Sequence, residues 1–240
     1  MKGIWSLTVL WIFMLSGAAA QGAQMVERGD LIAQWKVALR EIDHELASGE
    51  FSRAQREASR LADEMAQEMG VGGGSAYTLA LACAFRAIAE SGLGHDDDAL
   101  WHWRVANALD PTIEKVDLSS YGAPAARLRD TPFRSKFQST ASMDPEVKKR
   151  VQPPVVKKKP MPRYPENMRR MKVQTAYAFD VVIDENGHVE EPLVLKPVQE
   201  PGFVYVVLES VRKWVFQPAM LDGKPMAVRY TLTVDFKVKD

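Results

Sequence analysis

The stretch SVRKWVFQPAMLDGKPMAVRYTLTVDF, residues 210–236, decides the fold of this chain. Its second half alternates between apolar and mostly polar side chains, a period of two that is typical of an antiparallel strand with one buried face. The apolar positions are Val228, Tyr230, Leu232, Val234 and Phe236, and the positions between them are Arg229, Thr231, Thr233 and Asp235. Before this strand, Asp-Gly-Lys-Pro at 222–225 predicts a turn, because glycine adopts positive φ at little cost and proline favours turns. The turn folds Trp214 and Phe216 back onto the strand.

A hairpin is predicted upstream of this stretch. Residues 177–183 alternate with apolar side chains at every second position, Asp-Glu-Asn-Gly at 184–187 supplies a turn, and 189–195 returns as a second strand. The segment 203–214 fits two structures. Its valines favour a strand, whereas its apolar residues also recur at the i, i+4, i+8 and i+11 spacing of a helix.

Four motifs, in this order, resemble the C-terminal domain of the TonB family. They are Pro-Arg-Tyr-Pro at 162–165, Val-Val-Ile-Asp-Glu-Asn-Gly-His-Val at 181–189, Val-Arg-Lys-Trp-Val-Phe-Gln-Pro-Ala at 211–219 and Asp-Gly-Lys-Pro at 222–225. The sequence departs from the family at Thr175, where a glycine usually starts the first strand. The resemblance places this domain at residues 161–240 and implies a helix over 203–214. The implied fold is α+β, with N-terminal α-helical hairpins before a three-stranded antiparallel sheet and its packed helices.

Residues 1–20 are predicted to be a signal peptide. Lys2 precedes an apolar core from Ile4 to Leu15, and the small residues 16–20 are suited to cleavage after Ala20. An uncleaved anchor is the alternative, because the 18 uncharged residues of 3–20 are at the lower limit for spanning a bilayer. Either reading places the mature protein outside the cytoplasm.

Residues 26–128 are predicted to form a helical module. Apolar residues recur at spacings of three and four, and glycine-containing breaks divide the segment into two helical hairpins. The first helix has Leu31, Trp35, Ala38, Leu39, Ile42 and Leu46, and the second has Ala54, Ala58, Leu61, Ala62 and Met65. The later hairpin resembles a tetratricopeptide repeat at Ala87, Gly94, Ala99, Trp103, Ala106 and Pro111. Because so few repeats seldom stand alone, we expect residues 118–128 or a partner to cover the module.

Residues 129–160 are predicted to be a basic, proline-rich linker. Residues 144–172 carry 10 basic and 3 acidic side chains, net +7, whereas residues 26–118 carry 9 basic and 17 acidic ones, net −8. Prolines and like charges favour an extended tether, so the helical module is expected to melt independently of the C-terminal domain. No set of interleaved aromatic residues accompanies the basic run, which argues against nucleic-acid binding.

The sequence predicts neither an enzyme nor a bound cofactor or metal. His95, Asp98 and His102 lie close together, but acidic residues are also what the start of a helix attracts. The glycines of 72–74 lack the context of a phosphate-binding loop, and none of the common hydrolase or metalloprotease motifs occurs. Cys83 is the only cysteine, so it is expected to be a small buried apolar residue.

The family resemblance implies that the last strand binds an extended peptide by β-augmentation, as TonB-like domains bind the short box of outer-membrane receptors. Carried over to this sequence, the peptide-binding residues are Pro162, Tyr164, Pro165, Met226, Val228, Arg229, Tyr230, Thr231, Thr233 and Asp235. For Tyr164 the alternative is that its ring only packs on Trp214. An edge strand that binds peptides can equally pair with a second copy, so a homodimer stays an open alternative.

Two functional hypotheses follow. The first is a non-enzymatic periplasmic protein that joins a TPR-like adaptor to a TonB-like domain, with a TonB-dependent outer-membrane receptor or another envelope protein as partner. The second is an energy transducer anchored in the inner membrane and facing the periplasm. The family's transducers carry a histidine in the anchor helix, but residues 4–20 contain no ionisable side chain. The first hypothesis is therefore preferred, and membrane contact is expected only if 4–20 stays uncleaved.

Overall fold

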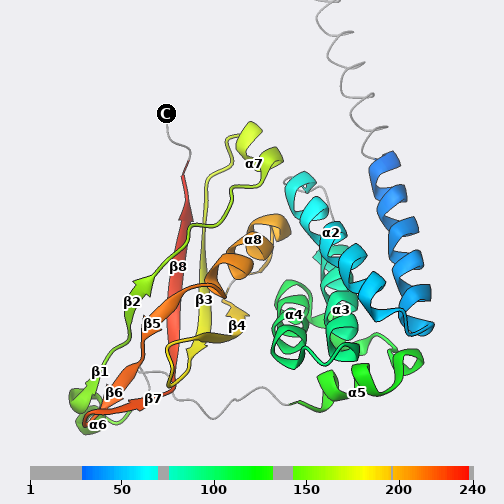
Figure 1. The fold of residues 1–240 in the computed structure, drawn as a ribbon. Coiled ribbons are helices and arrows are strands. Elements are labelled where there is room, and N and C mark those ends of the chain that lie inside the picture. The colour runs from blue at the N-terminus through cyan, green and yellow to red at the C-terminus, as the bar shows by residue number, and fades with distance from the viewer. Residues whose placement is uncertain (1–28, 70–75, 132–142, 196, 238–240) are drawn as a thin grey trace, which may run out of the picture. The chain divides into compact units, whose positions relative to one another are not determined.

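A computed structural model describes residues 29–69, 76–131, 143–195 and 197–237 (Figure 1). The chain divides into two units between Glu41 and Ile42, and each is described by itself. In the first unit residues 29–41 are helical, and the same helix continues to residue 47. Trp35 and Leu39 are buried, as their spacing predicts. The predicted signal peptide and the glycine run at 72–74 lie outside the described residues.

The helical part of the second unit begins with three helices, of which α2 and α4 both pack against α3. Their bounds are α2 Phe51–Glu68, α3 Ala76–Gly92 and α4 Asp96–Leu109. The apolar positions predicted for α2 are buried, and Cys83 is buried in α3. Two short 3₁₀ helices and a further helix follow, and this last helix packs against α3, as expected for a covering segment. They are η1 Pro111–Lys115, η2 Ser119–Tyr121 and α5 Gly122–Asp130.

The turns before α2 and α4 have the same geometry. Gly49 and Gly94 have φ of 76° and 77°, which favours glycine at both positions. The amide of Glu50 donates to the Glu45 carbonyl at 2.8 Å, and the amide of His95 donates to the Glu90 carbonyl at 2.9 Å. The two glycine turns, 45 residues apart in the sequence, therefore end their helices in the same way.

The C-terminal part is built on the predicted three-stranded antiparallel sheet, with strand order β4-β3-β8. The strands are β3 Thr175–Ile183, β4 Val189–Val194 and β8 Val228–Phe236. β3 and β8 pair along their whole length, from Thr175 opposite Phe236 to Ile183 opposite Val228. The strand β3 thus begins at Thr175 although the family glycine is missing. The predicted helix is present as α8, Pro201–Val211. The α+β fold is confirmed.

Two glycine turns hold the sheet and its neighbouring strands in register. Gly187 has φ of 87°, and its carbonyl accepts from the Phe216 amide at 2.9 Å. Asp184 fixes this turn, because its Oδ1 accepts from the amides of Asn186 at 2.9 Å and His188 at 2.6 Å. The predicted turn at Asp222 and Gly223 connects two further strands. They are β6 Ala219–Leu221 and β7 Lys224–Met226.

In the predicted linker, 129–160, Arg129 and Asp130 belong to α5, and residues 143–160 are not a tether. The latter form α6 Pro145–Arg150, β1 Val151–Gln152 and β2 Val155–Lys158. β1 pairs with β6, and β2 pairs with β5 Val215–Gln217. Pro145 begins α6, Pro153 and Pro154 lie between β1 and β2, and Pro160 follows β2, so no ladder donor is lost. The carbonyl of Pro160 accepts from Trp214 Nε1 at 3.0 Å and Ser210 Oγ at 2.7 Å, so this segment is part of the domain.

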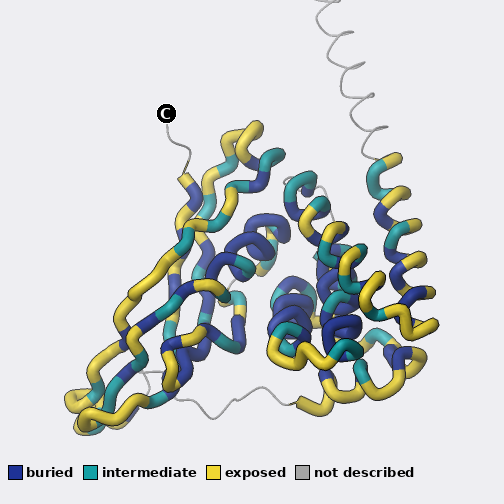
Figure 2. The backbone as a smooth tube through the Cα atoms, viewed as in Figure 1, coloured by how far each residue is buried: buried dark blue, intermediate teal, exposed yellow. Residues whose placement is uncertain are grey.

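Helix α8 lies between the sheet and the helical module, where it contacts α2 and α4 (Figure 1). Every residue of α8 except Glu209 is buried, which explains why its apolar pattern has no single face (Figure 2). The Tyr205 hydroxyl donates to Asp63 Oδ1 of α2 at 2.8 Å. Gly202 is required here, because a Cβ would lie 2.5 Å from the Ala66 carbonyl oxygen. The helical module and the C-terminal part therefore share one interface.

These contacts favour a single unfolding transition rather than the independent melting expected from the sequence. The second unit should unfold in one step, because separating the helices from α8 would expose a helix that is apolar on both sides. Thermal unfolding followed by far-UV circular dichroism and by tryptophan fluorescence should give coincident curves. Two separate transitions would show that the interface is weak.

Candidate peptide-binding site

The candidate site is the open edge of β8. In strand order β4-β3-β8 this strand has a neighbour on one side only among the described residues. It is nine residues long and contains no proline. Buried and exposed residues alternate along its second half (Figure 2). Such an edge presents unpaired amides and carbonyls to which an extended peptide can add.

The hydrogen-bond pattern shows which residues of β8 offer their backbone to solvent. The amide of Leu195 donates to the Ala178 carbonyl at 3.1 Å, so even-numbered residues of β3 bond toward β4 and odd-numbered ones toward β8. With the register of β3 and β8, the even-numbered residues of β8 pair with β3. The outward amides and carbonyls belong to Arg229, Thr231, Thr233 and Asp235.

The side chains of these four residues lie on the face of β8 opposite its buried one. Thr231, Thr233 and Asp235 are exposed, and Thr231 Oγ1 donates to Asp180 Oδ1 on β3 at 2.6 Å. The side chain of Arg229 is only 18% exposed, because it forms an ion pair with Glu191 at 3.5 Å. These side chains lie beside the backbone edge of β8 that pairs with no strand among the described residues.

Glu191 connects this site to the helical module, and sequence reasoning did not identify it. It is buried in β4 with φ of 51°, at the irregularity in the β3–β4 pairing. Its carboxylate pairs with Arg104 of α4 at 3.1 Å as well as with Arg229. A buried carboxylate requires such partners, but no sequence motif marks a bulge in a short strand.

Met226, predicted to be a peptide-binding residue of the last strand, does not belong to that strand. Met226 ends β7 and pairs with Ala219, and the chain leaves the ladder at Ala227. Met226 packs instead on the small cluster of Met143, Ala219 and Val228. The reason is the turn at 222–223, which closes a tight hairpin that takes up residues as far as Met226. Val228 does belong to β8, but its side chain is buried.

Tyr230, Pro162, Tyr164 and Pro165 are partly or fully buried, whereas Arg163 of the same motif is exposed. The Tyr230 ring meets the Phe216 ring edge to face at 6.3 Å. Pro162 is half-buried, and Pro165 is buried where α7, Glu166–Arg170, begins.

Tyr164 does not pack on Trp214. Its ring lies 5.2 Å from both Phe203 and Phe236, edge to face, and its hydroxyl donates to the Val173 carbonyl. Burial raises the pKa of Tyr164. Tyr164 therefore holds the end of β8 against α8. Trp214 lies instead beside the Phe216 ring, 6.3 Å away.

The edges of β2 and β4 are blunted. β2 has four residues, carries Lys157 and Lys158, and lies between Pro154 and Pro160. β4 contains Pro192 and the irregularity at Glu191, and it contacts α4. Short length, lysine, proline and bulges are the devices that prevent edge pairing. β8 is the longest described edge that lacks proline.

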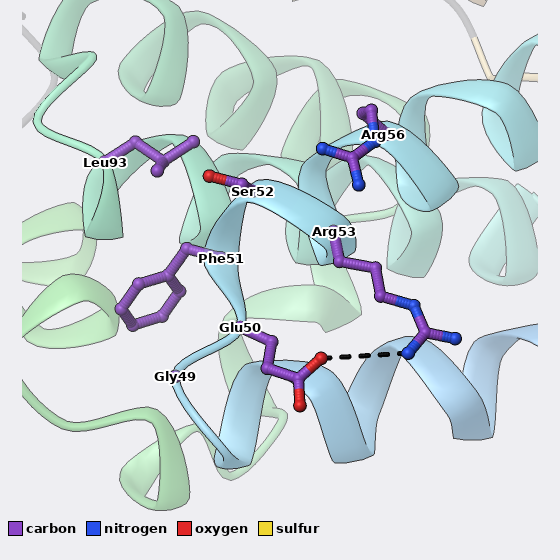
Figure 3. A pocket seen from close by; sticks show the side chains of 7 residues that line it. All are labelled: Gly49, Glu50, Phe51, Ser52, Arg53, Arg56 and Leu93. Atoms are coloured by element: carbon purple, nitrogen blue, oxygen red, sulfur yellow. Dashed lines mark ion pairs between the residues drawn. The ribbon is translucent and has the colours of Figure 1, made fainter.

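A pocket of about 280 Å³ lies on the helical module rather than near β8 (Figure 3). It is lined by Gly49, Glu50, Phe51, Ser52, Arg53, Arg56 and Leu93. Arg53 is already neutralised, because it pairs with Glu45 at 2.8 Å and with Glu50 at 3.8 Å. This open hollow offers no buried polar group to a ligand.

The histidine group singled out in the sequence is dispersed. His95 is exposed, Asp98 pairs with Arg212, and His102 is buried. Within the described ranges, no group of three or more histidine, cysteine, aspartate or glutamate side chains could hold a metal ion.

None of the helices in the described part of the chain is both long and apolar enough to cross a membrane.

Comparison with known proteins agrees with this architecture. The family described as "Gram-negative bacterial TonB protein C-terminal" matches residues 160–238. Protein TonB of Vibrio cholerae serotype O1 is 25% identical over 112 residues, which cover 45% of this chain and 46% of that protein. The matched part thus spans less than half of the relative's length. Residues 160–238 form a TonB C-terminal-like domain.

Proposed function

We propose that this protein binds extended peptide segments of envelope proteins, such as the boxes of TonB-dependent outer-membrane receptors, by adding them as a strand to β8. The observation that carries the proposal is the outward row of backbone groups at 229, 231, 233 and 235 on a long edge without proline. The TonB C-terminal-like domain at 160–238 supports it. In this role the protein is a non-enzymatic component of envelope transport.

The proposed location is the periplasm, with residues 1–20 removed as a signal peptide. In this proposal the helical module is a TPR-like adaptor that is already docked on the C-terminal domain through α8. The competing proposal is an energy transducer held in the inner membrane by residues 4–20, which contain no ionisable side chain. N-terminal sequencing of the mature protein discriminates the two: Gln21 supports the first proposal, and Met1 supports the second.

The peptide-binding proposal is tested by proline substitutions along β8. Thr233→Pro removes an outward amide, so it should abolish capture of a synthetic receptor-box peptide while the sheet stays folded. Thr233→Ala keeps the amide and should bind within about threefold of the unchanged protein, since one exposed side chain contributes little. Thr231→Pro should behave like Thr233→Pro, because both residues lie on the open side. Binding is measured by fluorescence anisotropy.

Leu232→Pro is the matched control for these variants. Its amide bonds to β3 and its side chain is buried, so this substitution should unfold the sheet. Circular dichroism separates the two classes of variant. If folded Thr231→Pro and Thr233→Pro variants still bind the peptide, augmentation on β8 is excluded. If the unchanged protein binds no peptide and sediments as a dimer that Thr233→Pro dissolves, a second copy occupies the edge.

A further inference from the structure

A buried charge cluster holds α8 to the helical module, and His102 of α4 lies at its centre with 0% of its side chain exposed. His102 Nδ1 lies 2.5 Å from Glu90 Oε2 of α3. On the other side of the ring, Nε2 lies 3.3 Å from Glu209 Oε1 of α8. Arg86 of α3 contacts both carboxylates, Glu90 at 3.0 Å and Glu209 at 3.8 Å. The cluster therefore joins three helices and crosses the interface.

With both carboxylates ionised, the charges of this cluster balance only when the imidazole carries a proton. Two carboxylates face one guanidinium, so a neutral His102 would leave one buried negative charge without compensation, which is costly. Geometry gives the same answer independently. Nδ1 lies within hydrogen-bond distance of Glu90, and Nε2 lies 3.3 Å from Glu209 without hydrogen-bond geometry. An imidazole carries protons on both nitrogens only as a cation, the form that two flanking carboxylates favour.

The other ionisable groups around His102 are already neutral or paired. From α2, Asp63 accepts from the Tyr205 hydroxyl of α8. On α4 itself, Asp98 pairs with Arg212, which follows α8. Burial raises the pKa of the Cys83 thiol on α3, so it stays neutral. On the side of the sheet, Arg104 of α4 pairs with Glu191 of β4. His102 is thus the group of this interface whose charge changes near neutral pH.

We propose that His102, held as an imidazolium between Glu90 and Glu209, is a proton-dependent clamp that keeps the helical module docked on α8. Loss of the proton leaves the two carboxylates with one compensating positive charge, that of Arg86. The excess buried negative charge then opens this interface. Glu209 is the one residue of α8 that is not buried, so it links the interface to solvent. The clamp acts on the arrangement of the two parts and does not depend on whether β8 binds peptides.

The direction of the pH dependence follows from the pKa of each group. Burial alone would lower the pKa of His102, but the adjacent carboxylates of Glu209 and Glu90 outweigh burial and raise it. Docking is therefore fully supported below the ordinary histidine pKa of about 6.5 and weakens as pH rises through the raised value. Burial opposes ionisation of Glu209, but His102, Arg86 and Arg212 lower its pKa to about 2. Its contribution is present above its ordinary value and lost only as pH falls toward 2.

Two measurements on the full chain test the clamp. Nitrogen NMR of the imidazole, assigned with His102→Gln, should show both ring nitrogens of His102 protonated at pH 7. Hydrogen–deuterium exchange of α8, corrected for the intrinsic pH effect, should lose protection about tenfold per pH unit from about pH 6.5 until His102 has lost its proton. The exchange of β3 and β8 reports the stability of the sheet in the same experiment.

Variants separate the clamp from a purely structural role. His95→Gln changes the exposed histidine just before α4 and should reproduce the pH profile of the unchanged protein. His102→Gln should give low α8 protection that does not vary between pH 6 and 9. Glu209→Gln should move the His102 titration to lower pH. A neutral His102 at pH 6 in the unchanged protein, α8 protection that is constant from pH 6 to 9, or an unchanged His102 titration in Glu209→Gln overturns the proposal.

Discussion

Replacing Gly187 by alanine should cost the C-terminal domain about 2 to 5 kcal/mol of its free energy of unfolding. A Cβ at this position would lie 1.9 Å from the carbonyl oxygen of Phe216, and Gly187 also has φ of 87°. Positive φ costs a non-glycine residue about 1 to 2 kcal/mol, and relieving an overpacked contact costs about 1 to 3 kcal/mol more. The loss is measured by urea denaturation.

Gly223→Ala is the matched control, because Gly223 also has positive φ, 79°, but a Cβ added there would have no atom within 4 Å beyond its own chain neighbours. It should lose only the cost of positive φ in a non-glycine residue, about 1 to 2 kcal/mol of the free energy of unfolding. Equal losses in the two variants would contradict the close approach of the Gly187 turn to Phe216.

Trp214→Ala should destabilise the protein by about 3 to 5 kcal/mol, the usual cost of removing a large buried aromatic side chain. Trp214 is 2% exposed, it packs beside Phe216, and its Nε1 donates to the Pro160 carbonyl at 3.0 Å. The substitution therefore removes a core side chain and the contact that holds the segment before α7. Chemical denaturation followed by far-UV circular dichroism measures the change.

Trp214→Phe separates packing from hydrogen bonding. It keeps an aromatic ring but loses the indole N–H, so it should cost about 1 to 2 kcal/mol. The Pro160 carbonyl is not orphaned, since Ser210 Oγ also donates to it at 2.7 Å. A loss below about 1 kcal/mol in Trp214→Ala would show that the indole is exposed in solution.

The sheet could be predicted because its residues alternate cleanly. The period of two in 228–236 places β8 correctly, and the Asp-Glu-Asn-Gly and Asp-Gly sequences place both turns. Helix α8 could not be derived from its pattern alone. Because it is buried on both sides, its valines satisfy a strand as well as a helix, and the family resemblance was needed to choose.

The details of the site depend on pairings that span the chain. The sequence shows which side chains of β8 alternate, but the outward direction of the Thr231 and Thr233 amides follows only from the register with β3 and its bonds to β4. The cluster around His102 could not be predicted either. Glu90 lies 12 residues from His102, whereas Glu209 comes from the other part of the chain. The linker prediction was wrong because the lysines and prolines of this segment indicated a tether, whereas residues 151–152 and 155–158 form the short strands β1 and β2.

The ladder between β3 and β8 also determines how the domain bears mechanical load. If a peptide adds to β8 as proposed, it runs along this strand, and tension in the peptide would act along the strand. The interstrand hydrogen bonds are perpendicular to that direction and share the load in shear, instead of rupturing one after another as in a peeled hairpin. Near its start β8 is tied through Arg229 to Glu191, and Glu191 is tied to Arg104 of α4, so such tension would reach the helices.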